Sequence, residues 1–442
     1  MKSRLPKLLH PLGGRPLLAH VIEAARQASE ARPLVVYSPA TSQICDVFAD
    51  GADFALQDEP RGTGDAVRAA LTALPDETTE VLVLNGDVPL VDPALLVELV
   101  ELRRSAEAVI ALLTVDSYQP EGLGRIVRDD SGHVIRIANE KDATAEELAI
   151  NEINAGFYAF DARWLRRRIP DLRPSPATGE LYLTDLVDYA RADHRPAVTL
   201  EVEDDGTLQG INDRVQLAAA ELDLRFRINQ GHMLAGVTIH DPGATYVDAS
   251  VEIAPDVTLE PNVILRGSTR IGRGTIIRSG SQIFDSVIGE RCMVWASVLE
   301  SSEVEDEVQI GPFAHLRPGA SIGRGAKLGN FAEVKKSRIG AGTQQHHFSY
   351  IGDADVGEGV NIGAGTITAN YDGRNKHRTV IGDRAFIGSD TMLIAPVTIG
   401  EGAGTGAGSV VNRDVPPDKM AVGVPARIRD RRRPTADAED AS

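Results

Sequence analysis

The sequence is poor in cysteine and aromatic residues and has no long apolar run. Its two cysteines, Cys45 and Cys292, are too few for a disulfide framework, and no Cys/His cluster has the spacing of a zinc site. Such cysteine usage favours a reducing compartment. No window approaches 18 consecutive apolar residues, and prolines and a glycine interrupt the basic N-terminal segment, which excludes a signal-peptide core there. We therefore expect a cytoplasmic protein without a membrane segment.

Acidic residues outnumber basic ones. The 442 residues include 64 Asp and Glu against 46 Lys and Arg, for a formal net charge of −18. This balance argues against general binding to nucleic acid, because no broad phosphate-neutralising surface is implied, but small anions could still bind in local basic pockets. A chain of this length with 42% hydrophobic residues predicts at least two domains, each with its own core.

Pairs of an aliphatic residue and a glycine recur through the C-terminal part at intervals of about 6, 12 or 17 to 18 residues. An aliphatic side chain at every sixth position can stack on its counterpart in the next coil, and the glycine after it tolerates the backbone angles of a sharp corner. The pattern predicts a three-sided parallel β-helix of roughly ten coils over residues 251–425. The pairs are Ile271-Gly272, Ile288-Gly289, Ile310-Gly311, Ile322-Gly323, Leu328-Gly329, Ile339-Gly340, Ile351-Gly352, Val356-Gly357, Ile362-Gly363, Ile381-Gly382, Ile387-Gly388 and Ile399-Gly400.

The first 200 residues instead alternate short apolar runs with helical patterns. Runs at 34–37, 81–84, 109–115 and 153–160 are typical of strands covered on both faces, and helices are expected at 16–29, 63–74 and 93–103. This order predicts an open, mostly parallel α/β sheet whose ligand lies beyond the carboxyl ends of the strands. The run at 81–84 would deliver Asn85, Gly86 and Asp87 to that edge.

Two further segments have distinct patterns. Apolar residues at 3.6-residue spacing from Leu208 to Phe226 predict a helix that links the two domains, with Gly231 as its stop. Past Arg427 the chain is charged and lacks apolar periodicity, so we expect a disordered tail.

Ordered motifs along nearly the whole chain carry a family resemblance. In the first half these are KSRLPKLLHPL at 2–12, QDEPRGTG at 57–64, NGDVPL at 85–90, GRI at 124–126, EKDA at 140–143 and EINAG at 152–156. In the second half they are LRPG at 316–319, GNFAEVKKS at 329–337, HFSYIGD at 347–353, NIGAGTITANYDG at 361–373 and GSDT at 388–391. Together they resemble the bifunctional bacterial UDP-N-acetylglucosamine pyrophosphorylases/glucosamine-1-phosphate N-acetyltransferases.

The resemblance implies a domain plan. Residues 1–206 would form a Rossmann-like α/β nucleotidyltransferase domain, 207–232 the linking helix, 233–427 a left-handed parallel β-helix acetyltransferase domain and 428–442 the tail. Members of the family have a strand and a loop like LAAGxGTRM ahead of the position of Met1. Without them we expect two neighbouring strands to lack partners and uridylyl transfer to be impaired, unless the start codon lies upstream.

For the first site, the resemblance implies binding of UDP-N-acetylglucosamine, with Mg²⁺ as cofactor and UTP as co-substrate. Gln57, Gly62 and Thr63 would face the uracil, and Lys7 would lie near phosphate. An oxygen-only pair of metal ligands suits Mg²⁺, which keeps several waters and bridges substrate phosphates. The remaining implied residues are Asn85 and Gly86 at the nucleotide, Gly124, Glu140 and Asn154 at the N-acetylglucosamine, and Asp87 and Asn212 at the metal.

For the second site, the resemblance implies His347 as the base that deprotonates the amine of glucosamine 1-phosphate during attack on acetyl-CoA. Histidine titrates near neutral pH and can accept a proton. His347 is expected on a stretch outside the repeat, 344–350, and the adjacent His346 remains an alternative base. The other implied residues are Arg317, Lys335, Tyr350, Asn361 and Lys376 at the sugar phosphate, and Ala364, Asn370, Tyr371, Ser389 and Ala407 at acetyl-CoA.

Three hypotheses remain open on sequence alone. The first is the bifunctional enzyme, which supplies a precursor for the peptidoglycan cell wall. The second is an acetyltransferase with a disabled nucleotidyltransferase domain, and the third is a non-catalytic sugar-nucleotide sensor. A homotrimer is expected, because a three-sided prism presents flat faces to its copies. The identity of the C-terminal cation that would bind the CoA phosphate is also open. Arg427 is displaced by one residue from the position that the family's arginine occupies.

Overall fold

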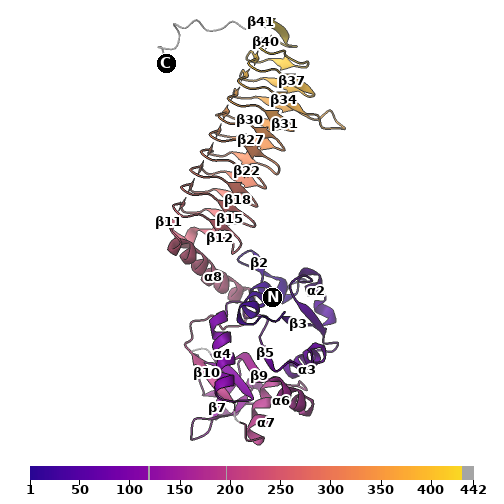
Figure 1. Cartoon of the computed structure of the whole chain (residues 1–442), viewed down its shortest axis with the longest axis vertical. Coiled ribbons are helices and arrows are strands. Elements are labelled where there is room, and N and C mark those ends of the chain that lie inside the picture. Colours follow the sequence, from indigo (N-terminus) through magenta and orange to yellow (C-terminus); the bar gives the residue numbers. More distant parts are fainter. Residues whose placement is uncertain (118–119, 196, 431–442) are drawn as a thin grey trace. The chain divides into compact units, whose positions relative to one another are not determined.

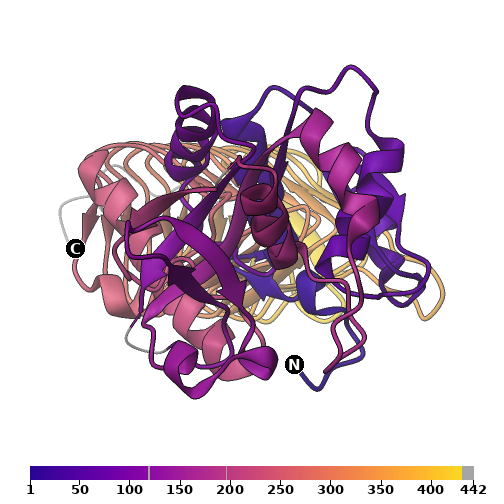
Figure 2. The same cartoon turned by 90° about the horizontal axis from the view of Figure 1, so that it is seen from below.

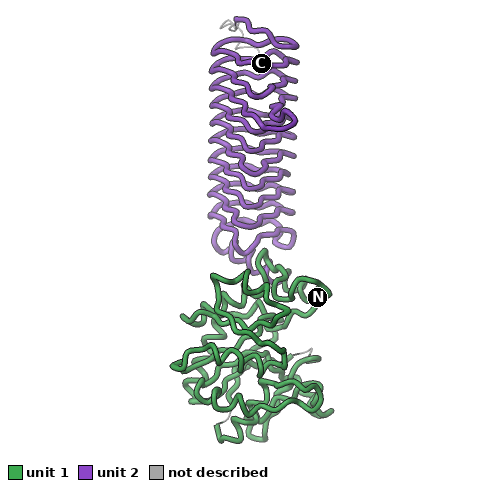
Figure 3. The backbone as a smooth tube through the Cα atoms, turned by 90° about the vertical axis from the view of Figure 1, so that its right-hand side faces the viewer, with its two compact units in different colours: residues 1–221 green, residues 222–442 purple. Residues whose placement is uncertain are grey.

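The computed structural model describes residues 1–117, 120–195 and 197–430, and the chain forms two compact units. The first unit is Met1–Glu221 and the second begins at Leu222 (Figure 3). No helix in these described ranges is long and apolar enough to cross a membrane.

The first unit is built on short strands flanked by helices (Figures 1 and 2). Its strands are β1 (Pro11–Leu12), β2 (Arg15–Pro16), β3 (Leu34–Tyr37), β4 (Asp53–Leu56), β5 (Glu80–Val83), β6 (Ile110–Asp116), β7 (Arg125–Arg128), β8 (Val134–Ala138), β9 (Glu152–Asp161) and β10 (Val198–Val202). Its helices are α1 (Leu17–Ala28), α2 (Gln43–Val47), α3 (Thr63–Ala73), α4 (Pro93–Ser105), α5 (Ala145–Leu148), α6 (Ala162–Arg168) and α7 (Leu186–Ala192). The 3-10 turns are η1 (Lys7–Leu9), η2 (Pro39–Thr41), η3 (Glu140–Asp142), η4 (Ile169–Asp171) and η5 (Leu183–Asp185).

Strand β6 shows why the predicted strands are nearly continuous apolar runs. Ile110 and Leu112 pack in one core cluster with α3, α6 and α7, whereas Ala111 and Leu113 pack in another with α4. Because side chains of a strand alternate between its two faces, a strand covered on both faces needs apolar residues at every position. All four predicted strands and all three predicted helices of this half are present within two residues of their expected bounds.

The sheet of this unit is mixed, so its expected mostly parallel character is a correction. Strands β6 and β10 are parallel, as are β3 and β4, but β9 runs antiparallel to both β5 and β6. Because β9 is antiparallel to β5 and to β6, no βαβ crossover joins it to either strand. In the described residues β3 pairs with β4 and β5 pairs with β9.

The linking helix is α8 (Arg214–Leu234), which spans the division between the units. It begins later than predicted because the Asp213 carboxylate accepts the backbone N–H groups of Val215 and Gln216, at 2.9 and 2.8 Å, as an N-cap does. The predicted stop at Gly231 is also wrong. The helix continues to Leu234, and Gly236, with φ 97°, ends it in the left-handed conformation.

The second unit is a left-handed parallel β-helix with three sheets (Figures 1 and 3). The first sheet comprises β11 (Thr238–Ile239), β14 (Thr258–Leu259), β17 (Ile276–Ile277), β20 (Met293–Val294), β23 (Gln309–Ile310), β26 (Lys327–Leu328), β29 (Gln344–Gln345), β32 (Asn361–Ile362), β35 (Phe386–Ile387), β38 (Gly404–Thr405), β40 (Lys419–Val422) and β41 (Arg427–Asp430). The second comprises β12 (Tyr246–Val247), β15 (Ile264–Arg266), β18 (Gln282–Phe284), β21 (Val298–Glu300), β24 (His315–Leu316), β27 (Ala332–Lys335), β30 (Ser349–Gly352), β33 (Ile367–Ala369), β36 (Met392–Ile394) and β39 (Val410–Val411). The third comprises β13 (Glu252–Ile253), β16 (Arg270–Ile271), β19 (Val287–Ile288), β22 (Glu303–Val304), β25 (Ser321–Ile322), β28 (Arg338–Ile339), β31 (Ala354–Val356), β34 (Thr379–Ile381) and β37 (Val397–Ile399).

The aliphatic residue of every predicted pair is buried inside this prism, which confirms the repeat. Among the twelve pairs, however, the expected reason for the following glycine, an unusual backbone conformation, holds only at Gly311, with φ 101°. Gly340 has an ordinary φ, but a Cβ on it would lie 2.3 Å from the carbonyl oxygen of Gly357 in the next coil. The left-handed glycine of that corner is Gly342, with φ 67°. Glycine follows the aliphatic residue because stacked corners approach too closely for a side chain.

One coil is longer than its neighbours. The Ala354 N–H contacts Ser337, 17 residues earlier, but the Glu358 N–H donates to Asp383, 25 residues later. The extra residues form a loop closed by a bridge between Tyr371 and Lys376. This loop interrupts the repeat and carries residues of the second candidate site.

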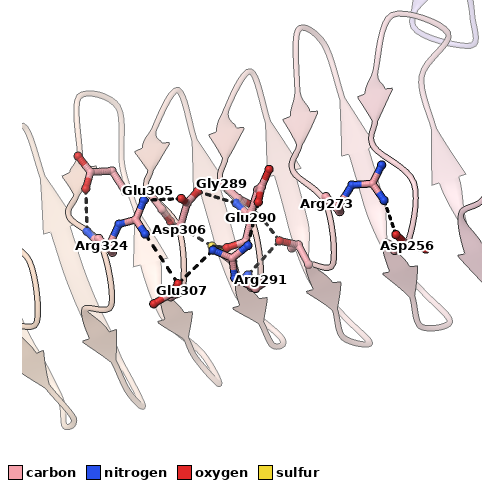
Figure 4. A network of polar contacts seen from close by, with 11 residues as sticks. Asp256, Arg273, Gly289, Glu290, Arg291, Glu305, Asp306, Glu307 and Arg324 are labelled. Carbon is pink, nitrogen blue, oxygen red and sulfur yellow. Dashed lines mark hydrogen bonds and ion pairs between the residues drawn. The ribbon is translucent and has the colours of Figure 1, made fainter.

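Charged residues form a ladder along the corner between the third and first sheets (Figure 4). Arg273 pairs with Asp256 at 2.5 Å, and Arg291 pairs with Glu307 at 3.0 Å, each across adjacent coils. Carboxylates also accept backbone N–H groups here, as Asp306 does from Glu290. Because these pairs are exposed, solvent screens them and each contributes little to stability.

The tail begins later than predicted. Strand β41 continues to Asp430 and pairs antiparallel with β40, and Lys419 forms an ion pair with Asp430. Residues 428–430 are therefore ordered by backbone pairing, which a composition-based interpretation does not detect. The rest of the predicted tail, 431–442, lies outside the described residues.

Candidate functional sites

In the first unit, three residues far apart in sequence meet around one ammonium group. Lys7 opens η1, Asp87 follows β5, and Asn212 lies just before α8. Lys7 Nζ donates to Asp87 Oδ2 at 2.5 Å and to Asn212 Oδ1 at 3.0 Å. The Ile211 N–H donates to the Asp87 carbonyl at 2.9 Å, which ties the segment before α8 to the end of β5.

Two oxygens that converge on one ammonium group can also hold a metal cation. A carboxylate and an amide oxygen are hard ligands of the kind Mg²⁺ binds. No group of three or more His, Cys, Asp and Glu side chains in the described ranges could hold a metal by itself. The donor set therefore fits an ion that takes its other ligands from water and substrate phosphate, as Mg²⁺ does in phosphoryl transfer.

The two residues before Asp87 have packing roles in this structure. A Cβ on Gly86 would lie 3.2 Å from Leu8 Cδ1, so glycine lets the η1 segment approach. Asn85 lies against Gly156, where a Cβ would be 2.0 Å from the Asn85 amide nitrogen. Asn85 is thus turned toward the 154–156 segment rather than toward Lys7.

The predicted uracil-facing residues lie together at the start of α3. Gln57 Nε2 donates to the Gly62 carbonyl at 3.2 Å and to the Asp65 carboxylate at 2.9 Å. Thr63 Oγ1 accepts the Leu183 N–H at 3.0 Å. Gly62, with φ 109°, has no room for a Cβ. Asp65 orients Gln57 but was missed from sequence. An acidic residue in the first turn of a helix is usually explained by its favourable interaction with the helix dipole.

The predicted N-acetylglucosamine residues also come together. The Asn154 N–H donates to the Gly124 carbonyl at 2.9 Å, and Glu140 accepts the Gly122 N–H and lies 3.6 Å from Arg125. Asn154 Nδ2 donates to the Tyr158 hydroxyl at 2.6 Å. Burial raises the pKa of Tyr158, so its phenol stays protonated and holds the Asn154 amide in one orientation.

In the second unit, His347 and three predicted acetyl-CoA residues occupy successive turns of one corner, between the first and second sheets. The Gly365 N–H donates to the Phe348 carbonyl at 2.8 Å. In the following coils the Asp390 N–H donates to Ala364 O at 2.6 Å, and the Gly408 N–H donates to Ser389 O at 2.8 Å. The four stacked corner residues are His347, Ala364, Ser389 and Ala407.

The stretch that carries His347 belongs to the repeat, contrary to prediction. Gln345 pairs in register with Leu328, and Tyr350 with Glu333, so the chain follows the regular coil on both sides of the corner. The His347 side chain is exposed there, and none of the described residues hydrogen-bonds its ring. His346 is also exposed, but its Nε2 lies 3.0 Å from Gln344 Oε1.

Three cations predicted to bind phosphate lie together at the far ends of strands in the second sheet, away from the His347 corner. The positive charge of Lys376, followed by that of Arg317, lowers the pKa of Lys335, so the three cations lie close enough to repel one another. Arg317 Nη1 also donates to Glu333 at 2.9 Å. Crowded cations of this kind attract a multivalent anion.

Tyr350 lies between the His347 corner and the cation edge. Its hydroxyl would be 2.3 Å from a Cβ on Gly352, so the ring lies over that glycine, which pairs with Lys335 in the next strand. Asn370 Nδ2 donates to Asp353 Oδ2 at 2.5 Å, and the Tyr371 hydroxyl donates to the Gly373 carbonyl at 2.7 Å.

Asn361 is on the other side of the corner, opposite Gln344 in the first sheet. Gly352, Asp353 and Glu333 support these residues but were missed from sequence. The only sequence signal for them is their place inside the motifs GNFAEVKKS and HFSYIGD.

Two family models match the chain. Residues 1–150 match the MobA-like NTP transferase domain, and residues 301–336 and 378–413 match the bacterial transferase hexapeptide repeat. The first match covers β1 to β8 and ends before β9 and β10 of the mixed sheet, and the second covers part of the stacked coils.

Curated relatives match over almost the whole chain. The bifunctional protein GlmU of Trichlorobacter lovleyi is 45% identical over 425 residues, which are 96% of this chain and 92% of the relative. The protein of the same name in Rubrobacter xylanophilus is 48% identical and covers 97% of this chain and 91% of its own length. The Kineococcus radiotolerans protein is 44% identical, with coverages of 96% and 87%.

Proposed function

The chain belongs to the family of the bifunctional protein GlmU, and we propose that it carries out two successive transfers with the residues described above. The first is N-acetylation of glucosamine 1-phosphate by acetyl-CoA. The second is uridylylation of N-acetylglucosamine 1-phosphate by UTP, which yields pyrophosphate and UDP-N-acetylglucosamine, a precursor of the peptidoglycan cell wall. The stacked corner of His347, with three cations across the adjacent sheet face, is the observation that carries the proposal.

In acetyl transfer, the substrate lies on the face of the second sheet. Its phosphate binds Arg317, Lys335 and Lys376, and Tyr350 contacts the sugar, together with Asn361. The acetyl donor lies along the corner, where Ala364 and Ala407 leave room for the pantetheine arm, and Asn370, Tyr371 and Ser389 complete its site. His347 accepts a proton from the amine as nitrogen attacks the thioester carbon and CoA leaves as the thiol.

In uridylyl transfer, the α-phosphate of UTP is attacked in line by the sugar 1-phosphate. Gln57, Gly62 and Thr63 bind the uracil, while Gly124, Glu140 and Asn154 bind the N-acetylglucosamine; Asn85 and Gly86 support the nucleotide from the turn before Asp87. The Lys7 ammonium, now held by Asp87 and Asn212, neutralises phosphate when substrate binds.

Mg²⁺ is the proposed metal, held by Asp87 and Asn212 through their oxygens. When bound it neutralises phosphate charge that develops during the transfer. The convergence of these two oxygens on one ammonium group supports the assignment, because the same oxygens can face a divalent ion.

A homotrimer is the proposed assembly. Aromatic side chains stay exposed on successive turns of the His347 corner, and Phe313 and Phe331 stack at 5.4 Å between ring centroids. Apolar rings in a row on one edge fit burial against a second copy better than exposure to water. The exposed members of this aromatic corner are Trp295, Phe313, Phe331 and Phe348.

The proposed setting is the cytoplasm, where the nucleotide and acetyl-CoA substrates are available. The expected domain plan is 1–206 for uridylyl transfer, 207–232 for the link and 233–427 for acetyl transfer. We propose the same plan with the link moved to α8, so that Asn212 belongs to the uridylyl-transfer domain.

The direct test uses the full chain with glucosamine 1-phosphate and acetyl-CoA, followed by UTP and Mg²⁺. We expect thiol release that requires the amino sugar phosphate, and then UDP-N-acetylglucosamine and pyrophosphate by mass spectrometry. Glucosamine lacking the phosphate is the control and should react far more slowly. Absence of thiol release would contradict the acetyl transfer, and absence of pyrophosphate would contradict the uridylyl transfer.

A further inference from the structure

A polar side chain interrupts the apolar interior of the prism directly below His347. Gln345 is fully buried, and it occupies the interior position that Leu328 fills in the preceding coil and Ile362 in the next. The core around it consists of aliphatic side chains. Burial of a primary amide costs free energy unless its groups are hydrogen-bonded.

Only one end of the Gln345 amide has a partner. Gln345 Nε2 donates to Ser349 Oγ at 2.7 Å, whereas Gln345 Oε1 is buried without a hydrogen bond from the described residues. Ser349 Oγ in turn donates to the carbonyl oxygen of His347 at 3.0 Å. A hydrogen-bonded path thus leads from the core, through Ser349, to the backbone of His347.

We propose that Gln345 and Ser349 are positioning residues for acetyl transfer, which set the orientation of the His347 peptide and thereby of its imidazole. This inference rests on the proposed role of His347 as the base. The side chains of corner residues 346–348 are exposed, so side-chain packing does not hold them. The hydrogen bond from Ser349 instead fixes the direction of the His347 carbonyl. This carbonyl is bonded to the Cα that carries the imidazole side chain.

The neighbouring coils indicate what a purely structural residue would be. An aliphatic side chain at position 345 would continue the column of Leu328 and Ile362 and would remove the unpaired amide oxygen. Such a replacement would take one hydrogen bond from Ser349, but the Ser349 hydroxyl keeps its bond to the His347 carbonyl, so we expect little loss of stability. The glutamine therefore does not serve the core, and its contribution lies at the corner.

The first test is Gln345→Leu in the full chain. We expect kcat for acetyl transfer to fall about 10- to 100-fold, with little change in either KM or in the unfolding midpoint. Ser281→Ala is the matched control, because Ser281 occupies the same interior column as Ser349 in an earlier coil and bonds only Val294 O among the described residues. An unaltered kcat in Gln345→Leu would overturn the proposal.

A pair of isosteric variants isolates the hydroxyl. In later coils the interior position that corresponds to Ser349 is occupied by Thr366 and Thr391, which are both buried. We therefore expect Ser349→Thr and Ser349→Val to fold. The threonine variant keeps the donor to His347 O and should keep most of the activity, whereas the valine variant should lose as much as Gln345→Leu. Equal activity of the two variants contradicts the relay.

A double-mutant cycle separates this inference from the proposed function. In a His347→Ala background, Gln345→Leu should lower the residual rate no further, because the relay acts only through His347. A full additional loss in that background would assign Gln345 a merely structural role. Failure of the proposed function is seen separately, as normal turnover of His347→Ala alone.

Discussion

The ammonium group of Lys7 lies 2.5 Å from Asp87 Oδ2 and so occupies the point on which Asp87 and Asn212 converge. A divalent ion bound by the same two oxygens must displace it. Under the proposed assignment, Lys7 would therefore compete with the metal until a substrate phosphate draws it away.

The first prediction follows from this competition. Lys7→Met should increase the affinity for Mn²⁺, a spectroscopic substitute for Mg²⁺, several-fold in the absence of nucleotide, because the two oxygens lose their internal cation. The same variant should lower the rate of pyrophosphate release, since the phosphate loses a cation. Electron paramagnetic resonance of free Mn²⁺ measures the binding.

Lys141→Met is the control for that experiment, because it removes the same charge from another loop of the first unit. Its Mn²⁺ affinity should match that of the unaltered chain. If Lys7→Met and Lys141→Met bind Mn²⁺ equally, Asp87 and Asn212 are not the metal ligands.

The second prediction concerns the adjacent histidines. His347→Ala should lower acetyl transfer about 10²- to 10⁴-fold, the usual contribution of a general base, and leave the unfolding midpoint unchanged because the side chain is exposed. His346→Ala should keep near-normal turnover, since its ring contacts Gln344 on the same turn. Thiol release with saturating substrates compares the two. The reverse order of activities would identify His346 as the base.

The third prediction uses the close contact between Tyr350 and Gly352. A Cβ at position 352 would lie 2.3 Å from the tyrosine hydroxyl, so Gly352→Ala must displace the ring. We expect the KM for glucosamine 1-phosphate to rise roughly tenfold, with little change in the KM for acetyl-CoA. Gly231→Ala, where a Cβ meets nothing within 4 Å, is the control. An unchanged sugar-phosphate KM would remove Tyr350 from the sugar site.

The fourth prediction concerns pH and the stability of the first unit. Burial, followed by the negative charges of Asp188 and Asp142, raises the pKa of Asp185 from 3.8 to about 6, against the opposing charge of Arg136. The folded state thus binds this proton more tightly than the unfolded chain, so the Asp185 contribution to stability falls as pH rises from about 4 to about 6.

Asp185→Asn removes that loss. We expect its unfolding midpoint to exceed that of the unaltered chain by roughly 2 °C at pH 7.5, and the difference to vanish near pH 4. Calorimetry at both pH values measures it, with the exposed Asp130→Asn as control. A difference that is the same at both pH values would show that the effect is not electrostatic.

The fifth prediction concerns assembly. Light scattering at micromolar concentration should give the mass of a trimer, and Phe313→Asp with Phe331→Asp should give monomers without acetyl transfer, because charges on the aromatic corner cannot be buried unpaired. Phe226→Asp, at another exposed aromatic on α8, is the control and should stay trimeric. A stable, active monomer would contradict the proposed homotrimer.

The sequence by itself determined the β-helix and most elements of the first unit. Stacking of coils demands an aliphatic residue at each interior position, so columns such as Ile322, Ile339 and Val356 leave a regular period in the sequence. Likewise β6 is buried on both faces, and its sequence is therefore a nearly continuous apolar run. The motifs then identified the candidate residues, some of which the structure brings into contact, such as Lys7 with Asp87 and Asn212.

Only the tertiary structure decided the relationships that depend on distant partners. The antiparallel position of β9, the convergence of Lys7 with Asp87 and Asn212, and the glycine required under Tyr350 arise between chain segments whose spacing carries no local signal. Position 345 shows most plainly what the sequence alone cannot predict. A glutamine between two other polar residues is typical of an irregular loop, whereas register with Leu328 places it inside the prism. There the hydrogen bond of its amide nitrogen leads to His347 through Ser349.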